Sequence, residues 1–330
     1  MPDILITESI GGAAVDMLKS KFDVVHLPEL WKDPGALIAR IKEFRALIVR
    51  NQTRVTSEVL AAATDLIVVG RAGVGLDNVD TTYASNASIV VTYTPDQNAI
   101  SVAELTIGLM LCLARMVPAA DLHTKSGEWD RHNFHGIELY GKTLGIIGAG
   151  KIGYLTAKRA QAFGMKILAY DPFLSQDNVL LSELNAELVE LDELLERADV
   201  VSCHLPATQE TIGLLNKARF DRMKSTAYFI NTARGEVVCE SDLLEALKSG
   251  AIAGAALDVR AEEPPKSGEL ELLPNVILTP HIAAFTYQAQ ERVTKAICED
   301  VARVLQGKAA RNAVNKSITL GRVSALQDYD

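Results

Sequence analysis

The chain has 330 residues, enough for two domains, and its 48% apolar and 23% charged residues are typical of globular proteins. Its formal net charge is −9, and it has no basic block. Binding to nucleic acid requires a basic surface that neutralises phosphates, so we exclude nucleic acids as partners. A small anionic substrate stays compatible with this charge, because it needs only a local cluster of cations.

The cysteines and the apolar segments indicate the compartment. The most apolar stretch, Leu105–Ala114, is shorter than the roughly 20 residues of a membrane-spanning helix and indicates a packed helix. The first residues, MPDILITESI, lack the basic region and long apolar core of a secretory signal. The cysteines form no C-x-x-C pair, which predicts buried thiols rather than disulfides or a metal site. These are Cys112, Cys203, Cys239 and Cys298. We therefore expect a cytoplasmic protein without a membrane partner.

Short apolar runs alternate with helical patterns in the first hundred residues, which is typical of a parallel sheet covered by helices. The predicted strands are Ile4–Ile6, Val24–Val25, Ala46–Val49, Leu66–Val69 and Ile89–Val91. Helical patterns lie between them at Gly12–Lys19, Gly35–Glu43 and Ser57–Ala63. We interpret this series as one small α/β unit.

A second α/β series begins at Lys142, after a long helical pattern from Ile100 to about Lys125. Its predicted strands are Thr143–Ile147, Lys166–Tyr170, Val200–Cys203, Ala227–Asn231, Ala255–Val259 and Val276–Thr279. Another long helix, Thr286–Gln306, follows them. Because two long helices bracket the second series, we interpret residues 100–285 as a domain inserted into a first domain of residues 1–99 and 286–330. The tail from Lys308 to Asp330 is then expected to return to the first domain.

The strongest local motif is the glycine pattern GAGKIG at residues 148–153, between a predicted strand and a helical pattern. In this pattern Gly148 makes a tight turn, Gly150 lets the backbone approach a pyrophosphate, and Gly153 lets helix and strand pack closely. The free N–H groups at the start of the helix bind phosphates. A plain turn between strand and helix is the alternative. The flanking elements and a downstream acidic residue favour a dinucleotide site.

That acidic residue, Asp171, ends the next predicted strand and predicts NAD as the cofactor. Its carboxylate can accept hydrogen bonds from the ribose hydroxyls of NAD. Opposite the additional phosphate of NADP, two like charges ~4 Å apart repel by about 4 kcal/mol at an effective dielectric constant near 20. One charged hydrogen bond returns only about 1.5–3 kcal/mol. The next residues, Pro172 and Phe173, offer no cation for such a phosphate.

Polar residues follow three predicted strands of the second series, at the sheet edge where doubly wound folds bind ligands. Arg234, in the run NTARG, can hold a carboxylate with two parallel N–H bonds. Glu262 and Glu263 follow the strand that ends at Val259, and His281 follows the last strand. Histidine titrates near neutral pH and can exchange the proton that accompanies hydride transfer. The alternatives are a loop-capping arginine and a structural histidine, and the shared sheet edge favours catalysis.

These motifs resemble the D-isomer-specific 2-hydroxyacid dehydrogenase family, and within it the phosphoglycerate dehydrogenases most closely. The resembling segments cover nearly the whole chain in the order ALIVRNQTRVT, VGRAGVGLDNVD, TPDQN, VAEL, GKTLGIIGAGKIG, NTARGEVV, GAALDV, EEPP and NVILTPHI. The resemblance implies two doubly wound α/β domains, a flavodoxin-like substrate domain interrupted by an inserted Rossmann NAD-binding domain, with the active site between them. It also implies a homodimer or a higher homo-oligomer. We expect no C-terminal regulatory domain after the last helix.

The resemblance also implies roles for residues. His281 is the general acid/base, Glu263 its carboxylate partner because it directly precedes Pro264, and Arg234 the cation that orients the substrate. The residues expected on NAD are Gly148, Gly150, Lys151, Ile152, Gly153, Asp171, Leu205, Thr232, Ala233, Arg234 and Asp258, with Val74 near the nicotinamide. The loop of Gly73, Val74 and Gly75 is expected to offer backbone N–H groups to the substrate carboxylate.

Three arginines help to predict which acid is the substrate. Arg50, Arg54 and Arg71 lie at or just past predicted strand ends of the first unit. If two of them face the substrate, they bind a second anionic group; the alternative is that they are solvated. This favours 3-phosphoglycerate, with hydroxypyruvate, glyoxylate and sulfolactate as other candidate acids. Three residues depart from the usual pattern of the family and keep the choice open. They are Asn51, Arg260 and Phe285.

A function of another class is possible on the same fold. NAD-binding corepressors resemble this family and act as partner-binding sensors. The chain has no long disordered tail and no basic nuclear-targeting run, which disfavours this class. Formate dehydrogenases are expected to have Gln in place of the carboxylate partner, and Glu263 disfavours them. The sequence therefore predicts an NAD-dependent oxidoreductase that acts on a small anionic 2-hydroxy or 2-keto acid.

Overall fold

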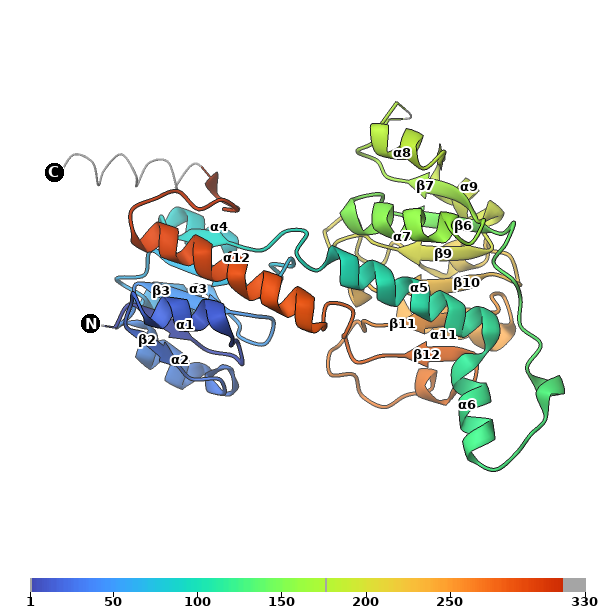
Figure 1. Ribbon diagram of the computed structural model, residues 1–330, viewed down its shortest axis with the longest axis horizontal. Coiled ribbons are helices and arrows are strands. Elements are labelled where there is room, and N and C mark those ends of the chain that lie inside the picture. The colour runs from blue at the N-terminus through green and yellow to red at the C-terminus, as the bar shows by residue number, and fades with distance from the viewer. Residues whose placement is uncertain (1, 176, 317–330) are drawn as a thin grey trace. The chain divides into compact units, whose positions relative to one another are not determined.

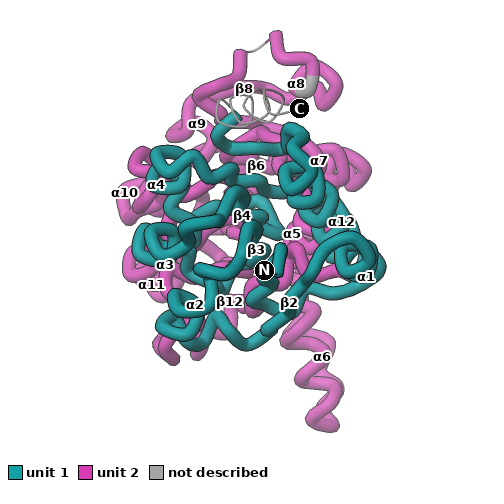
Figure 2. Tube along the Cα trace, turned by 90° about the vertical axis from the view of Figure 1, so that its left-hand side faces the viewer, with its two compact units in different colours: residues 1–98, 287–330 teal, residues 99–286 magenta. Residues whose placement is uncertain are grey.

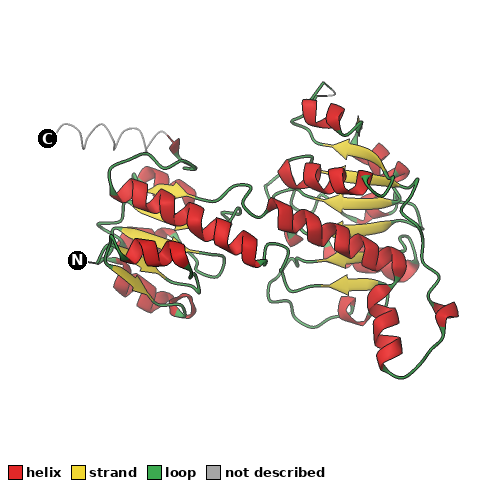
Figure 3. Cartoon of the chain, in the orientation of Figure 1, coloured by secondary structure: helices red, strands yellow, loops and turns green. Residues whose placement is uncertain are grey.

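The computed structural model describes residues 2–175 and 177–316 (Figure 1). Contacts between Cα atoms divide the chain into two compact units, coloured separately in Figure 2. Unit 1 comprises the chain up to Asn98 and from Tyr287 onward, and unit 2 is Ala99–Thr286. In each unit helices cover both faces of a parallel sheet (Figure 3), and the predicted α/β fold class is confirmed.

Unit 1 contains a five-stranded parallel sheet in the order β2-β1-β3-β4-β5. Its strands are β1 (Ile4–Ile6), β2 (Val24–His26), β3 (Ala46–Val49), β4 (Val68–Arg71) and β5 (Val90–Thr92). Its α-helices are α1 (Ala13–Lys19), α2 (Pro34–Ile41), α3 (Ser57–Ala62), α4 (Thr81–Asn86) and α12 (Tyr287–Leu305), with a short 3₁₀ helix η1 at Leu30–Lys32. Because side chains alternate along a strand, Ile4 and Ile6 pack against α1 and α12, whereas Leu5 packs against α2 and α3. The strand order places a switch point between β1 and β3, where such sheets bind ligands.

The segment after α12 is fixed to the edge of this sheet. The buried carboxylate of Asp300 accepts hydrogen bonds from the Thr92 hydroxyl at 3.0 Å and from the backbone N–H groups of Arg311 and Asn312 at 2.9 and 3.0 Å. The side chain of Asn315 accepts from the Val91 N–H at 3.0 Å. The predicted return of the tail to the first unit is confirmed for this part, and residues 317–330 lie outside the described residues.

Unit 2 contains a seven-stranded parallel sheet in the order β12-β11-β10-β9-β6-β7-β8. Its strands are β6 (Thr143–Ile147), β7 (Lys166–Tyr170), β8 (Glu187–Leu188), β9 (Val200–Cys203), β10 (Tyr228–Asn231), β11 (Gly254–Leu257) and β12 (Val276–Leu278). The sequence missed β8, because its two residues, Glu187 and Leu188, do not form an apolar run. The chain order reverses between β6 and β9, which is the switch point of a Rossmann sheet.

Helices cover both faces of the second sheet. One face packs against α5 (Ala99–Arg115), α7 (Lys151–Gln161) and α8 (Val179–Glu183). The other face packs against α9 (Leu191–Arg197), α10 (Lys217–Phe220) and α11 (Glu240–Ser249). The 3₁₀ helices of this unit are η2 (Arg131–Asn133), η3 (Gly235–Val237) and η4 (Leu270–Leu272). Apolar residues of the strands are buried on both faces, as expected for a parallel sheet between helices.

The prediction of one long helix from Ile100 to about Lys125 is wrong. The helix breaks at Met116, which has a left-handed backbone (φ 53°), and α6 (Val117–Lys125) then starts at an angle of 64° to α5. Pro118 has no N–H to continue the first helix and fits the first turn of a new one. No residue of α6 is buried, and the helix extends away from the sheet of unit 2 (Figure 1).

Two further findings concern the expected thiols and membrane segments. The four cysteines are free, as predicted, but only Cys203 and Cys298 are buried, whereas Cys112 and Cys239 are partly exposed. Among the described residues, no single helix is both long and apolar enough to cross a membrane. The helices α5 and α6 meet that criterion only when they are taken together, as a bent pair. The other predicted strands and helices agree with the structure to within two residues at each end.

Candidate active site

The glycine motif forms a tight loop between β6 and α7. Gly148 has a left-handed backbone (φ 92°), and a Cβ atom there would lie 3.0 Å from the carbonyl oxygen of His204. A Cβ atom on Gly153 would overlap the carbonyl oxygen of Gly148. Gly150, which caps α7, has open space where a Cβ atom would be. The loop is therefore closed on its inner side by backbone and open at the helix start, as a pyrophosphate requires.

Asp171 lies beside this loop. Its carboxylate accepts hydrogen bonds from the backbone N–H groups of Ala149 and Phe173, both at 3.0 Å. The acidic side chain at the end of β7 is thereby held against the glycine motif. Lys151 and Ile152 form the first turn of α7. The contact of Asp171 with a ribose stays a prediction.

The other predicted cofactor residues of unit 2 follow neighbouring strands. Leu205 is buried just after β9, and Thr232 and Ala233 follow β10. The Thr232 hydroxyl hydrogen-bonds to that of Thr106 on α5, at 2.9 Å. β9 lies next to β6 and β10 lies next to β9, so these positions are at the carboxyl edge where the glycine loop begins.

Asp258 follows β11 and has a structural task that the sequence did not indicate. Only 1% of the residue is exposed, and its carboxylate accepts from the Thr279 hydroxyl at 2.5 Å and from the N–H groups of Ile282 and Ala283 at 2.9 and 2.8 Å. Its carbonyl oxygen accepts from the N–H of His281 at 2.9 Å. Asp258 thus holds the loop of His281, whose backbone is left-handed (φ 54°). An additional bond to a cofactor amide stays a prediction.

His281 and Glu263 form a direct pair. The distance from His281 Nδ1 to Glu263 Oε2 is 2.6 Å, and the two side chains are 39% and 35% exposed. Burial acts to raise the pKa of Glu263, but the hydrogen bond and charge of His281, the N–H of Arg260 and the charge of Arg234 hold it below its usual value. Glu263 is therefore ionised at neutral pH. His281 carries its proton on Nδ1, and Nε2 is left to exchange a proton with a ligand.

Arg234 lies at the end of β10, close enough to Glu263 for its charge to act on that carboxylate. Its Nη1 donates to the carbonyl oxygen of Ala233 at 2.7 Å, and its own carbonyl oxygen accepts from the side chain of Asn231 at 2.8 Å. Within unit 2 the structure therefore brings together the three residues predicted to be catalytic.

The predicted substrate residues of unit 1 lie at the ends of β3 and β4. Arg50 follows β3, and Arg71 ends β4. The Arg71 guanidinium occupies the space where a Cβ atom of Gly73 would be, so the two are in close contact. Val74 and Gly75 follow in the same loop, and both are partly exposed. Arg54 is exposed.

The sequence interpretation missed a buried carboxylate that shapes this region. Glu8 is 2% exposed and accepts hydrogen bonds from the backbone N–H groups of Arg50, Gln52 and Thr53 at 2.7, 3.1 and 3.0 Å. The Asn78 side chain donates to the carbonyl oxygens of Arg50 and Thr53 at 2.9 and 2.7 Å. An acidic residue two positions after the apolar run of β1 was the signal that could have shown it. The loop after β3 is therefore held in one conformation.

Two histidines outside the predicted site have settings that the sequence did not show. His204 follows β9, its Nε2 lies 3.0 Å from the Ser202 hydroxyl, and burial lowers its pKa to about 4. His123 also faces a carboxylate, because its Nδ1 lies 2.9 Å from an oxygen of Glu128. That second pair lies at α6, away from the strand ends.

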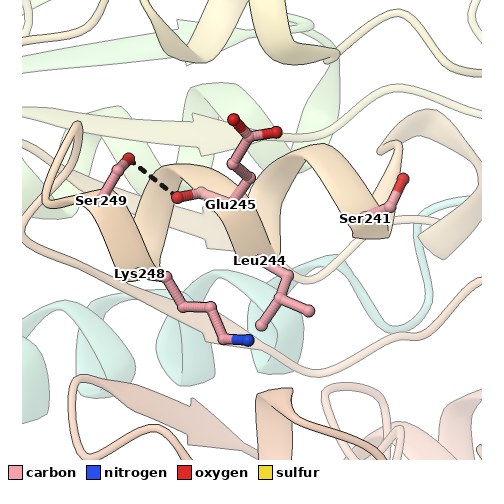
Figure 4. Close-up of a pocket in the computed structure, with 5 residues that line it drawn as sticks. All are labelled: Ser241, Leu244, Glu245, Lys248 and Ser249. Carbon is pink, nitrogen blue, oxygen red and sulfur yellow. Dashed lines mark hydrogen bonds between the residues drawn. The ribbon is translucent and has the colours of Figure 1, made fainter.

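A shallow hollow runs along α11 (Figure 4). The hydroxyl of Ser249 donates to the carbonyl oxygen of Glu245 beside it, at 2.8 Å. The hollow contains none of the predicted site residues. Its lining residues are Ser241, Leu244, Glu245, Lys248 and Ser249. Among the described residues, no group of three or more His, Cys, Asp or Glu side chains is arranged to hold a metal ion.

Comparison with known proteins gives consistent matches. Residues 107–283 match the family model "D-isomer specific 2-hydroxyacid dehydrogenase, NAD binding domain". A D-3-phosphoglycerate dehydrogenase of Archaeoglobus fulgidus is 45% identical over 314 residues, which are 94% of this chain and 59% of that protein. The chain spans about six-tenths of the length of the curated relatives it matches.

Solved structures are similar over nearly their full length. The TT0316 protein of Thermus thermophilus has a TM-score of 0.89 and 36% identity, and the match covers 94% of this chain and 99% of that chain. A D-lactate dehydrogenase of Aquifex aeolicus, solved with NAD and lactic acid, has a TM-score of 0.84 and 30% identity, with 95% and 99% covered.

Substitutions of Gly150 and Gly153 are expected to have different effects. We expect Gly153→Ala to destabilise the protein without cofactor by about 1–3 kcal/mol, because the methyl group would overlap the Gly148 carbonyl oxygen. Gly150→Ala should leave that stability unchanged, because its φ is −65° and its Cβ position is open. It should instead weaken NADH binding, because a pyrophosphate approaches this backbone closely.

Chemical unfolding without cofactor and fluorescence titration with NADH measure the two effects. Equal losses of stability in both variants, or an unchanged NADH affinity in Gly150→Ala, would contradict this account of the loop.

Proposed function

This chain belongs to the D-isomer specific 2-hydroxyacid dehydrogenase family, with its NAD-binding domain in residues 107–283, and we propose that it catalyses hydride transfer to and from C2 of a small anionic 2-hydroxy or 2-keto acid. The observation that carries the proposal is the 2.6 Å pair of His281 and Glu263 beside Arg234, in the same unit as the glycine loop. An imidazole held by a carboxylate supplies the proton exchange that such a reaction needs.

The residues of unit 2 fit NAD. The loop of residues 148–153 is a cradle that Cβ atoms would fill, and Asp171 lies against it with no adjacent cation for a second phosphate. When bound, NAD exchanges the hydride with the substrate. We propose that unit 2 is the NAD-binding domain, close to residues 100–285, and that unit 1, close to residues 1–99 and 286–330, is the substrate domain.

His281 acts as the general acid/base in this proposal. Glu263 fixes the proton on Nδ1, so Nε2 donates a proton to the substrate oxygen when the keto acid is reduced and accepts one when the hydroxy acid is oxidised. The ionised Glu263 can accept the Nδ1 hydrogen bond in both directions of the reaction.

Arg234 orients the substrate. Its guanidinium can bind the carboxylate of the acid with two parallel N–H bonds and polarise the adjacent carbonyl group. In unit 1, Gly73, Val74 and Gly75 are proposed to offer backbone N–H groups to a substrate carboxylate. The close contact of the Arg71 guanidinium with Gly73 adds positive charge at that loop and supports this role.

We propose 3-phosphoglycerate, or its keto form, as the substrate. The Archaeoglobus relative named above supports it, and so does the loop after β3, in which buried Glu8 holds the backbone of Arg50 in place. Two arginines at neighbouring strand ends, Arg50 and Arg71, suit a phosphate beyond the carboxylate. Hydroxypyruvate, glyoxylate and sulfolactate are the competing acids.

We also propose that the protein is a cytoplasmic homodimer or higher homo-oligomer. Large apolar side chains are exposed on and near α6, where a monomer leaves them in water. They are Met116, Val117, Leu122 and Trp129, with exposed fractions between 36% and 86%.

The role of His281 is tested by His281→Ala. We expect kcat to fall about 10²–10⁴-fold with 3-phosphohydroxypyruvate and NADH, the range for loss of a general acid/base, while NADH binding is kept. The control is Glu262→Ala, because Glu262 is 68% exposed and lies beside Glu263 without touching the imidazole. Steady-state kinetics and NADH titration give both values. An unchanged kcat in His281→Ala, or an equal loss in the control, would refute the assignment.

The distal anion site is tested by Arg50→Ala. We expect KM for 3-phosphohydroxypyruvate to rise about 10–100-fold, which corresponds to one lost charged hydrogen bond. KM for glyoxylate, which has no distal anion, should change less than about threefold by the same reasoning. The matched control is Arg54→Ala at an exposed arginine, for which the KM values for both substrates should stay unchanged. Equal rises for both substrates in Arg50→Ala would show that this arginine does not bind the phosphate.

A further inference from the structure

The loop that carries Glu263 has little apolar packing of its own. Val259 and Leu270 at its two ends are buried, with 2% and 4% exposed. Between them Arg260 is partly exposed and every residue from 261 to 269 is exposed. A segment without buried apolar contacts opens readily unless polar interactions hold it. The loop therefore needs an anchor between Val259 and Glu263.

The side chain of Arg260 is that anchor. Its Nε and Nη2 donate to the two carboxylate oxygens of Glu240, both at 3.0 Å, in a bidentate pair. Its Nη1 donates to Glu271 at 2.6 Å. The Arg260 side chain is only 12% exposed, and the two carboxylates come from separate elements, the start of α11 and η4. Paired guanidinium–carboxylate bonds fix orientation as well as distance.

The backbone of the same residue reaches the catalytic carboxylate. The Arg260 N–H donates to Glu263 Oε1 at 3.0 Å, while Oε2 faces His281. Glu240 also accepts from the N–H of Ala261 at 2.7 Å, so one carboxylate holds both the side chain and the following peptide. A Cβ atom on Gly235 would overlap the carbonyl group of Arg260, so this backbone lies directly on the turn after Arg234.

We propose that Arg260 is a positioning residue: its ion pairs with Glu240 and Glu271 hold its N–H on Glu263, and thereby keep that carboxylate on His281. This inference rests on the proposed function, because it assigns Arg260 a task in the proton exchange at His281. Arg260 itself touches no reacting atom. Because it acts by positioning Glu263, its loss should lower kcat and leave the binding of NADH and of the substrate carboxylate unchanged.

The experiment compares Arg260→Met with Arg222→Met as the matched control. Arg222 also pairs with two carboxylates, Asp192 at 3.2 Å and Glu196 at 2.6 Å, but lies away from the loop. With 3-phosphohydroxypyruvate and NADH, we expect kcat to fall about 10–100-fold in Arg260→Met, the order of loss for a misplaced catalytic group. KM, the Kd for NADH and the melting temperature should stay close to wild type, and the control should be unchanged throughout.

Two further variants keep the test decisive. Glu240→Gln should also lower kcat, but by a smaller factor, because it removes one carboxylate charge that pairs with Arg260 and keeps Arg260 itself. In a Glu263→Gln background, Arg260→Met should cause no further loss of kcat, because the group through which it acts is gone. A purely structural role would instead lower kcat in both backgrounds, together with the melting temperature.

Hydrogen exchange of the peptide that spans residues 258–268 separates this inference from the proposed function. We expect faster exchange in Arg260→Met than in the wild type or in Arg222→Met, whether or not any acid is turned over. A wild type inactive on every acid tested would refute the proposed function but leave this exchange result standing. Wild-type kcat in both Arg260→Met and Glu240→Gln, unchanged exchange, or an additive loss with Glu263→Gln would overturn the positioning role.

Discussion

The hydrogen bond between His281 Nδ1 and Glu263 Oε2 joins two loops that follow different strands of one sheet, and the other features of the site act on it. Asp258 holds the loop of His281 through its carboxylate and its carbonyl oxygen. Arg260 holds the loop of Glu263. Because the two anchoring residues are separated only by Val259, the segment after β11 controls both partners of the pair. In the proposed mechanism, proton exchange at Nε2 therefore depends on the rigidity of this segment.

Close backbone contacts are a second constraint on the same unit. Gly235 allows the loop after β11 to lie on the turn after β10, and Gly153 allows α7 to lie on the loop after β6. Larger side chains at these positions would push apart elements whose spacing the site requires. Parallel strands make this possible, since their carboxyl ends meet at one edge and each adds a short loop there. In unit 1 a side chain has the corresponding role: the buried carboxylate of Glu8 holds the loop after β3 by three hydrogen bonds.

Much of the fold followed from local patterns. Apolar runs of two to five residues located the strands, and polar residues two to four positions past their ends indicated Arg234, the pair Glu262 and Glu263, and His281. The break at Met116 was missed because the apolar pattern of the helix continues through it and only the following Pro118 marks a new start. The two-residue strand β8 has no sequence pattern of its own, because it is defined by its pairing with β7.

The anchoring roles could not be predicted, because they depend on which residues distant in sequence become neighbours. Arg260 differed from the usual pattern, but nothing local indicates that Glu240 and Glu271 meet its guanidinium. Asp258 was predicted as a cofactor contact, whereas its carboxylate accepts three bonds from residues 279–283. Glu8 was visible as an acid after a strand, yet its partners lie more than forty residues away.

The central claim is that Glu263 acts only through His281. A double-mutant cycle tests it directly, with kcat/KM measured for the wild type, Glu263→Gln, His281→Ala and the double variant. We expect the double variant to lose no more activity than His281→Ala alone. Losses that multiply would mean that Glu263 contributes independently of the imidazole, and the pair would not be the unit that exchanges the proton.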